Sequence, residues 1–421
     1  MSGNYYTSIP NEWRNMFSSQ LTINDISQYL TKLTAKVYYI KQKIDLDYKW
    51  LDLDNNLPYT FQSFDEGHTI GGEIQVDFSL GSHYLTLGLD FDRAYARSVL
   101  WNVGGVYSWF GMQPEDRKGY SQTMALFAQD EWKLSPFVTM TLGLRYTSSE
   151  NKVSHHQVFP DRVNGTKDDN IVGSLGLVYY DNEGLTLRAL VSQGFRSPTL
   201  SDQLMGGPYQ MSIPNPNLKP EKSLNFELGA RYSNNNLTVD AALFYSSLDD
   251  AYYEKVTDIP NPIGFMTQVQ NSDKATSYGA EILVEYFIEN LGLTPYLSMT
   301  AMRYVRKYDN GYKTDNTGVP KTWGNGGFRW ERNLSDNLRI FTDASLTWSA
   351  GYHDEGPNGI TDSTKFKNSG TRVDFVIGLE GGENHKFKAT LNFRNIGDQK
   401  YEPNWYFQPG FHVVGTIGYE Y

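Results

Sequence analysis

EIQVDFSL, residues 73–80, and YLTLGLDFD, residues 84–92, alternate apolar and polar residues without a break. This alternation predicts β-strands with two different faces, because successive side chains of a strand point to opposite sides of the sheet. The same pattern recurs along the chain in VTMTLGLRY (138–146), LNFELGARY (224–232) and FKATLNF (387–393). The chain is therefore predicted to be all-β.

The length and the ends of these runs favour a transmembrane antiparallel β-barrel over a soluble sandwich. The runs reach ~9–11 residues, enough for a tilted strand to cross a bilayer, whereas strands of globular domains are usually ~5–6 residues long. Several runs end in an aromatic residue, such as Tyr146 and Tyr232, which suits the depth of the lipid headgroups. The apolar faces would contact outer-membrane lipid and the charged faces would line a lumen. Counting the runs predicts roughly 16 strands, with long loops at 151–170, 199–222, 250–275, 306–325 and 352–369.

Composition agrees with a barrel that has a wet interior. Of 421 residues only 39% are hydrophobic, while 14% are aromatic, and no stretch approaches the ~18 apolar residues of a transmembrane helix. The absence of cysteine excludes disulfides, thiolate metal sites and cysteine nucleophiles. A net charge of −11 without a basic run argues against a nucleic-acid partner.

The last ten residues, HVVGTIGYEY (412–421), alternate and end on an aromatic residue. Ile417, Tyr419 and Tyr421 share one face, which resembles the C-terminal insertion signal that the barrel assembly machinery reads in proteins of the Gram-negative outer membrane. The closing strand of a complete barrel must pair with the first strand, because an open edge in lipid leaves backbone groups without hydrogen bonds.

We expect residues 1–421 to form a single barrel unit. Three segments of it resemble TonB-dependent receptors, and these segments lie mainly within residues 121–421. They are LFAQDEWKLSP (126–136) with TLGLRY (141–146), VSQGFRSPTLSDQL (191–204) with NPNLKPEKSLNFELG (215–229), and NFRNIGDQKYEPNWYFQPG (392–410). The second pair carries the family's loop motif, whose residues here are Phe195, Arg196, Pro198, Asn215, Asn217, Leu218, Pro220 and Glu221.

The motif residues can have structural roles that do not depend on a ligand. Prolines stop strand pairing, asparagines form local turns, and Glu221 is expected to pair with Arg196 or to accept backbone N–H groups. We favour this structural role over direct contact with a ligand.

The resemblance implies an outer-membrane receptor for energy-coupled uptake of a scarce metal chelate, most often an iron-siderophore. A receptor for haem or cobalamin and a passive porin are the alternatives. Such transporters have 22 strands and a plugged lumen, whereas no plug domain, TonB box or signal peptide is recognisable in this sequence. We therefore expect the C-terminal portion of an N-terminally truncated receptor, for which the TonB complex is a partner only if a plug and a TonB box are supplied elsewhere.

Aromatic residues in the expected extracellular loops are the candidates for ligand contact, with Arg196. Aromatic rings and a guanidinium suit an aromatic or catecholate chelate, although the upper aromatic girdle would place the same residue types there. The candidates are Trp101, Tyr107, Trp109, Phe110 and Tyr209.

Catalysis and bound cofactors are not expected. His155 and His156 are adjacent and would point to opposite faces of a strand, so we expect no metal site there. No nucleophile motif such as G-x-S-x-G is present, and the sequence predicts a protein that is not an enzyme.

Overall fold

A computed structural model describes residues 3–52, 57–104, 115–157, 165–205, 213–261, 264–308, 311–355, 361–367, 369–382, 386–399 and 409–420. It contains 22 strands, and 18 of them form one antiparallel sheet. Its first half consists of β1 (Gly3–Asn24), β2 (Leu30–Asp52), β3 (Leu57–Leu80), β4 (His83–Gly104), β5 (Glu115–Ser135), β6 (Val138–His156), β7 (Gly165–Tyr180), β8 (Leu185–Arg196) and β9 (Glu221–Ser233).

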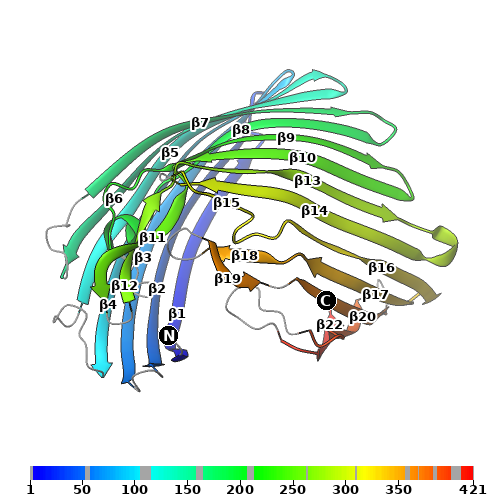
Figure 1. Cartoon of the computed structure of the whole chain (residues 1–421). Helices are drawn as coiled ribbons and strands as arrows, with labels where there is room; N and C mark the ends of the chain where they lie inside the picture. The colour runs from blue at the N-terminus through cyan, green and yellow to red at the C-terminus, as the bar shows by residue number, and fades with distance from the viewer. Residues whose placement is uncertain are drawn as a thin grey trace.

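The second half of the sheet continues in sequence order and curls round (Figure 1). It consists of β10 (Leu237–Asp249), β13 (Lys274–Tyr286), β14 (Leu293–Lys307), β15 (Lys313–Asp315), β16 (Thr322–Ser335), β17 (Leu338–Ser349), β20 (Gly370–Gly381), β21 (Phe387–Arg394) and β22 (His412–Tyr419). Two separate hairpins lie outside this wall, β11 (Tyr252–Asn261) with β12 (Gly264–Asn271) and β18 (Tyr352–Glu355) with β19 (Thr361–Lys367). The short helical turns are η2 (Ser201–Met205) and η3 (Glu289–Leu291).

The wall confirms the all-β barrel architecture but is not closed among the described residues. β1 pairs only with β2, and β22 pairs only with β21, so each of the two strands has an open edge there. Without the short β15, seventeen strands follow one another in antiparallel order. An odd number leaves β1 and β22 pointing the same way, and their direct pairing would have to be parallel. An antiparallel closure needs a further odd number of strands between them.

Many strands are longer than the alternation predicted, and the expected loops are correspondingly shorter. The first five each span more than 20 residues, and the loops expected at 250–275 and 352–369 contain the two hairpins. The alternation of apolar and polar residues marks only the part of a strand with lipid on one face. The hydrogen-bonded ladder continues where both faces are polar, and there the pattern gives no signal.

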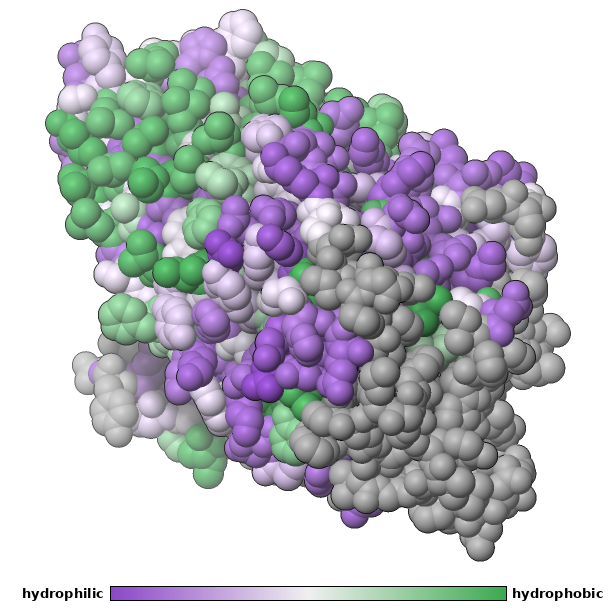
Figure 2. Space-filling model, turned by 90° about the vertical axis from the view of Figure 1, so that its left-hand side faces the viewer, coloured by the Kyte–Doolittle hydropathy of each residue, from purple (hydrophilic) through white to green (hydrophobic). Residues whose placement is uncertain are grey.

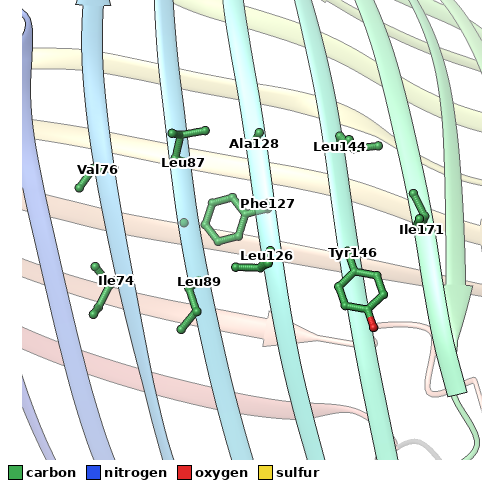
Figure 3. A pocket seen from close by; sticks show the side chains of 11 residues that line it. Ile74, Val76, Leu87, Leu89, Leu126, Phe127, Ala128, Leu144, Tyr146 and Ile171 are labelled. Carbon is green, nitrogen blue, oxygen red and sulfur yellow. The ribbon is translucent and has the colours of Figure 1, made fainter. Parts of the chain in front are cut away.

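The outer face of the wall is apolar over a broad band. Ile74, Leu89, Leu126, Tyr146 and Ile171 lie opposite one another across β3 to β7, and each is at least 39% exposed. Figure 3 shows them side by side on neighbouring strands, where they line a shallow hollow. Figure 2 shows this apolar surface giving way to a hydrophilic one. Exposed aliphatic side chains on this scale mark the surface that lipid covers.

The opposite face carries charges that pair with one another. Arg145 bonds to Asp90 at 2.8 Å, and Arg188 lies 3.0 Å from both Glu227 and Asp240. These pairs line the lumen. No helix among the described residues is long and apolar enough to cross a membrane.

Aromatic rings on the inner face lie flat over glycines of the neighbouring strand. A Cβ atom at Gly88 would be 2.1 Å from Cζ of Phe127, and one at Gly378 would be 2.2 Å from Cζ of Phe341. Glycine is required at these positions because the ring occupies the volume of any side chain.

Candidate functional site

The connection between β8 and β9 folds back against the inner face of the wall. Leu200 packs on Val153, and their exposed fractions are 8% and 0%. Beside them the side chain of Gln203 is 2% exposed. Its Oε1 accepts hydrogen bonds from Asn151 Nδ2 at 3.1 Å and from Thr166 Oγ1 at 2.5 Å, and its Nε2 donates to the Leu218 carbonyl at 3.1 Å. One buried amide thus joins the loop to β6, to β7 and to its own far end.

Three residues form a node where this loop leaves and rejoins the wall. Arg196, the last residue of β8, donates from Nε to Glu221 Oε2 at 2.5 Å, and Glu221 is the first residue of β9. The other oxygen of Glu221 accepts the backbone N–H of Tyr252 at 2.5 Å. Both contacts expected for Glu221, to Arg196 and to a backbone N–H, are therefore present.

Tyr252 completes the node from the β11–β12 hairpin. Its ring lies 4.4 Å from the Arg196 guanidinium, and its hydroxyl donates to the Arg196 carbonyl at 3.1 Å. Burial of this ring in the hairpin raises the pKa of Tyr252 far above its ordinary range. Glu221 is 9% exposed, but the Arg196 side chain is 58% exposed. The node thus holds a cation in one geometry and leaves it open to solvent.

The second half of the motif is bonded to the β11–β12 hairpin. Asn215 Nδ2 donates to the Val269 carbonyl at 2.8 Å, and Gln268 Nε2 donates to the Pro214 carbonyl at 3.0 Å. Asn271 exchanges two 3.0 Å bonds with the backbone of Lys219. Loop and hairpin therefore form one hydrogen-bonded unit at this end of the wall (Figure 1).

The remaining motif residues lie within the same unit. Asn217 donates its backbone N–H to Asn215 Oδ1 at 3.2 Å, which is the local turn expected for asparagine. Pro198 and Leu218 are buried, Pro220 is partly buried, and Phe195 lies in β8 opposite Lys222. Whether any of them contacts a ligand stays a prediction.

The other candidates are placed only in part. Trp101 lies in β4 opposite Gln62 and not in a loop, because the β3–β4 ladder continues past the apolar band. Tyr107, Trp109, Phe110 and Tyr209 lie outside the described residues, as does Tyr421. Ile417 and Tyr419 lie in β22 and are 79% and 61% exposed.

Sequence reasoning missed three residues that hold the site together, namely Gln203, Tyr252 and Asn271. Their partners lie tens of residues away in the chain, so no local pattern marks them. Among the described residues, no group of three or more His, Asp or Glu side chains is arranged to hold a metal ion.

The sequence matches the family model "TonB dependent receptor-like, beta-barrel" over residues 2–396. The chain belongs to this family. Its curated relatives include the iron-regulated outer membrane virulence protein of Vibrio cholerae serotype O1, 31% identical over 173 residues, and the ferric enterobactin receptor of Pseudomonas aeruginosa, 27% identical over 195 residues. The aligned regions are 37% and 42% of this chain but only 23% and 24% of those receptors.

A solved structure shows the same architecture. The copper transporter OprC superposes with a TM-score of 0.79 at 15% identity, over 98% of this chain and 66% of that one. The fold, the family and the outer-membrane location of this receptor barrel follow from these comparisons and from the apolar outer face.

Proposed function

We propose that this receptor barrel takes up a metal chelate of the iron-siderophore type, which it binds at the loop-bearing end of its lumen. The observation that carries the proposal is the Arg196 node. Its guanidinium is fixed by Glu221 and Tyr252, lies on the inner face and stays largely open to solvent. A cation held in this way suits an anionic chelate, because little side-chain entropy remains to be lost on binding.

The names of the relatives support an iron-bearing cargo, since one is iron-regulated and another takes ferric enterobactin. Uptake by this family depends on TonB, and we propose the TonB complex as the source of energy where a plug and a TonB box accompany this barrel. Binding and transport, without catalysis, are the activity that we propose for the chain.

Binding of a ferric tricatecholate to the purified barrel, followed by quenching of its tryptophan fluorescence, tests the proposal. We expect Arg196→Ala to weaken binding by roughly 10- to 100-fold, since a hydrogen bond to a charged group contributes about 1.5–3 kcal/mol. Arg303→Ala is the matched control, because that side chain is 55% exposed and pairs with Asp315 at 3.1 Å. Absence of binding to the wild-type barrel, or equal losses in the two variants, would count against the proposed site.

A further inference from the structure

The outer face of β2 to β6 changes abruptly from apolar to charged. On β4 the outward residues are Leu87, Leu89 and Phe91, and the next outward residue is Arg93. One step farther, a row of outward side chains crosses five strands through the register partners Lys41, His68, Tyr95, Tyr120 and Lys152. This row lies ~20 Å along the strand from the level of Leu89, at the border of the apolar band.

Arg93 is held by aromatic rings and has no acidic partner among the described residues. Its guanidinium lies 4.1 Å from the ring centroid of Tyr120 and 4.8 Å from that of Tyr95. Its Nε is buried without a hydrogen-bond partner. The Tyr120 hydroxyl donates to Glu150 at 2.8 Å, which fixes one of the two rings. The rings therefore orient a guanidinium that forms no side-chain ion pair with the described residues.

Cations on this border differ in their ion pairs from the cations of the next row of outward side chains. Among the residues that the structure describes, Lys41, Arg93 and Lys152 form no ion pair. In the next row Lys43 pairs with Asp45 at 3.1 Å, while Arg97 and Lys118 pair with Asp116 at 3.0 and 3.5 Å. The cations nearest the apolar band are therefore the ones that form no ion pair with a carboxylate.

We propose that Lys41, Arg93, Tyr95, Tyr120 and Lys152, here called the outer basic patch, bind the phosphate of an outer-leaflet lipid headgroup. Guanidinium and ammonium groups are the usual protein partners of phosphate. The occupant is a lipid because the patch lies at the edge of the apolar outer face, ~20 Å along the strands from the hollow lined by Leu89, Leu126 and Ile171. Acyl chains can lie in that hollow while the headgroup reaches the patch.

Native mass spectrometry of the full chain in dodecyl maltoside micelles tests this site, with phosphatidic acid as the probe and phosphatidylcholine as the zwitterionic comparison. We expect Arg93→Gln to lower the affinity for phosphatidic acid roughly tenfold, the effect of losing one charge-assisted hydrogen bond. Arg97→Gln is the matched control, because this arginine lies on the same face of the same strand but is already paired. It should bind within about twofold of the wild type.

Three results would overturn the proposal: equal affinities of the Arg93 and Arg97 variants, equal binding of phosphatidylcholine, or displacement of the lipid by millimolar inorganic phosphate, which would show a site for the free ion. If Arg93→Gln fails to fold, the double variant Lys41→Gln/Lys152→Gln replaces it, since both side chains are exposed. It should bind phosphatidic acid several-fold more weakly than Lys43→Gln/Lys118→Gln, whose lysines are paired. Equal binding by the two double variants would also overturn the proposal.

Discussion

Gln203→Ala should release the β8–β9 loop from the wall without unfolding the barrel. The change removes three hydrogen bonds, to Asn151, Thr166 and the Leu218 carbonyl. Each such bond contributes about 0.5–1.5 kcal/mol net, so the free energy of local opening should fall by about 2–4 kcal/mol. Amide exchange in the loop should then accelerate by roughly 30- to 700-fold.

Hydrogen exchange measured by mass spectrometry can follow this opening in peptides that cover residues 199–205 and 213–220. The reporters are the amides of Gln203 and Leu218, which are bonded to the Thr199 and Asn215 carbonyls. Gln129→Ala is the control, because its amide makes only an exposed 3.4 Å contact with Glu131. Unchanged exchange in both peptides, with Gln203→Ala folded, would refute the idea that this buried amide holds the loop.

Three further outcomes follow from single contacts. Gly88→Ala should destabilise the barrel by about 1–3 kcal/mol in denaturant unfolding, because the new Cβ meets the Phe127 ring, and Phe127→Ala in the same chain should recover most of the loss. Tyr252→Phe removes one hydrogen bond and should speed loop exchange by no more than about tenfold, with chelate affinity nearly unchanged. Burial tends to raise the pKa of Asp116, but the hydrogen bond from Arg97 outweighs this effect and lowers it below 3.8. The carboxylate therefore stabilises the folded state above the ordinary pKa, and acidification below pH 3.8 should remove that contribution. The loss should be smaller in Arg97→Gln, where Lys118 alone remains beside Asp116.

The fold was predictable because the bilayer imposes a simple pattern on each strand. Where one face meets lipid and the other meets water, as in residues 84–92, the sequence must alternate, and no knowledge of neighbouring strands is needed. The motif around Arg196 and Glu221 could also be found, because its residues resemble the loop motif of the family, and its asparagines predict the local turns that the loop contains. Strand lengths and the two hairpins could not be predicted, since ladders with two polar faces leave no periodic signal.

Only the tertiary structure decided which residues meet. In the sequence Gln203 is one loop glutamine among others, and only the folded sheet brings it into contact with Asn151 and Thr166. Arg93 differs from Arg97 only because adjacent strands place carboxylates next to Arg97. The sequence determined that the chain forms a membrane-spanning β-sheet with an apolar outer face, because the alternation of apolar and polar residues is a property of each strand alone. Strand register determined where the wall presents a fixed or unpaired cation, because that property depends on pairs of residues far apart in the chain.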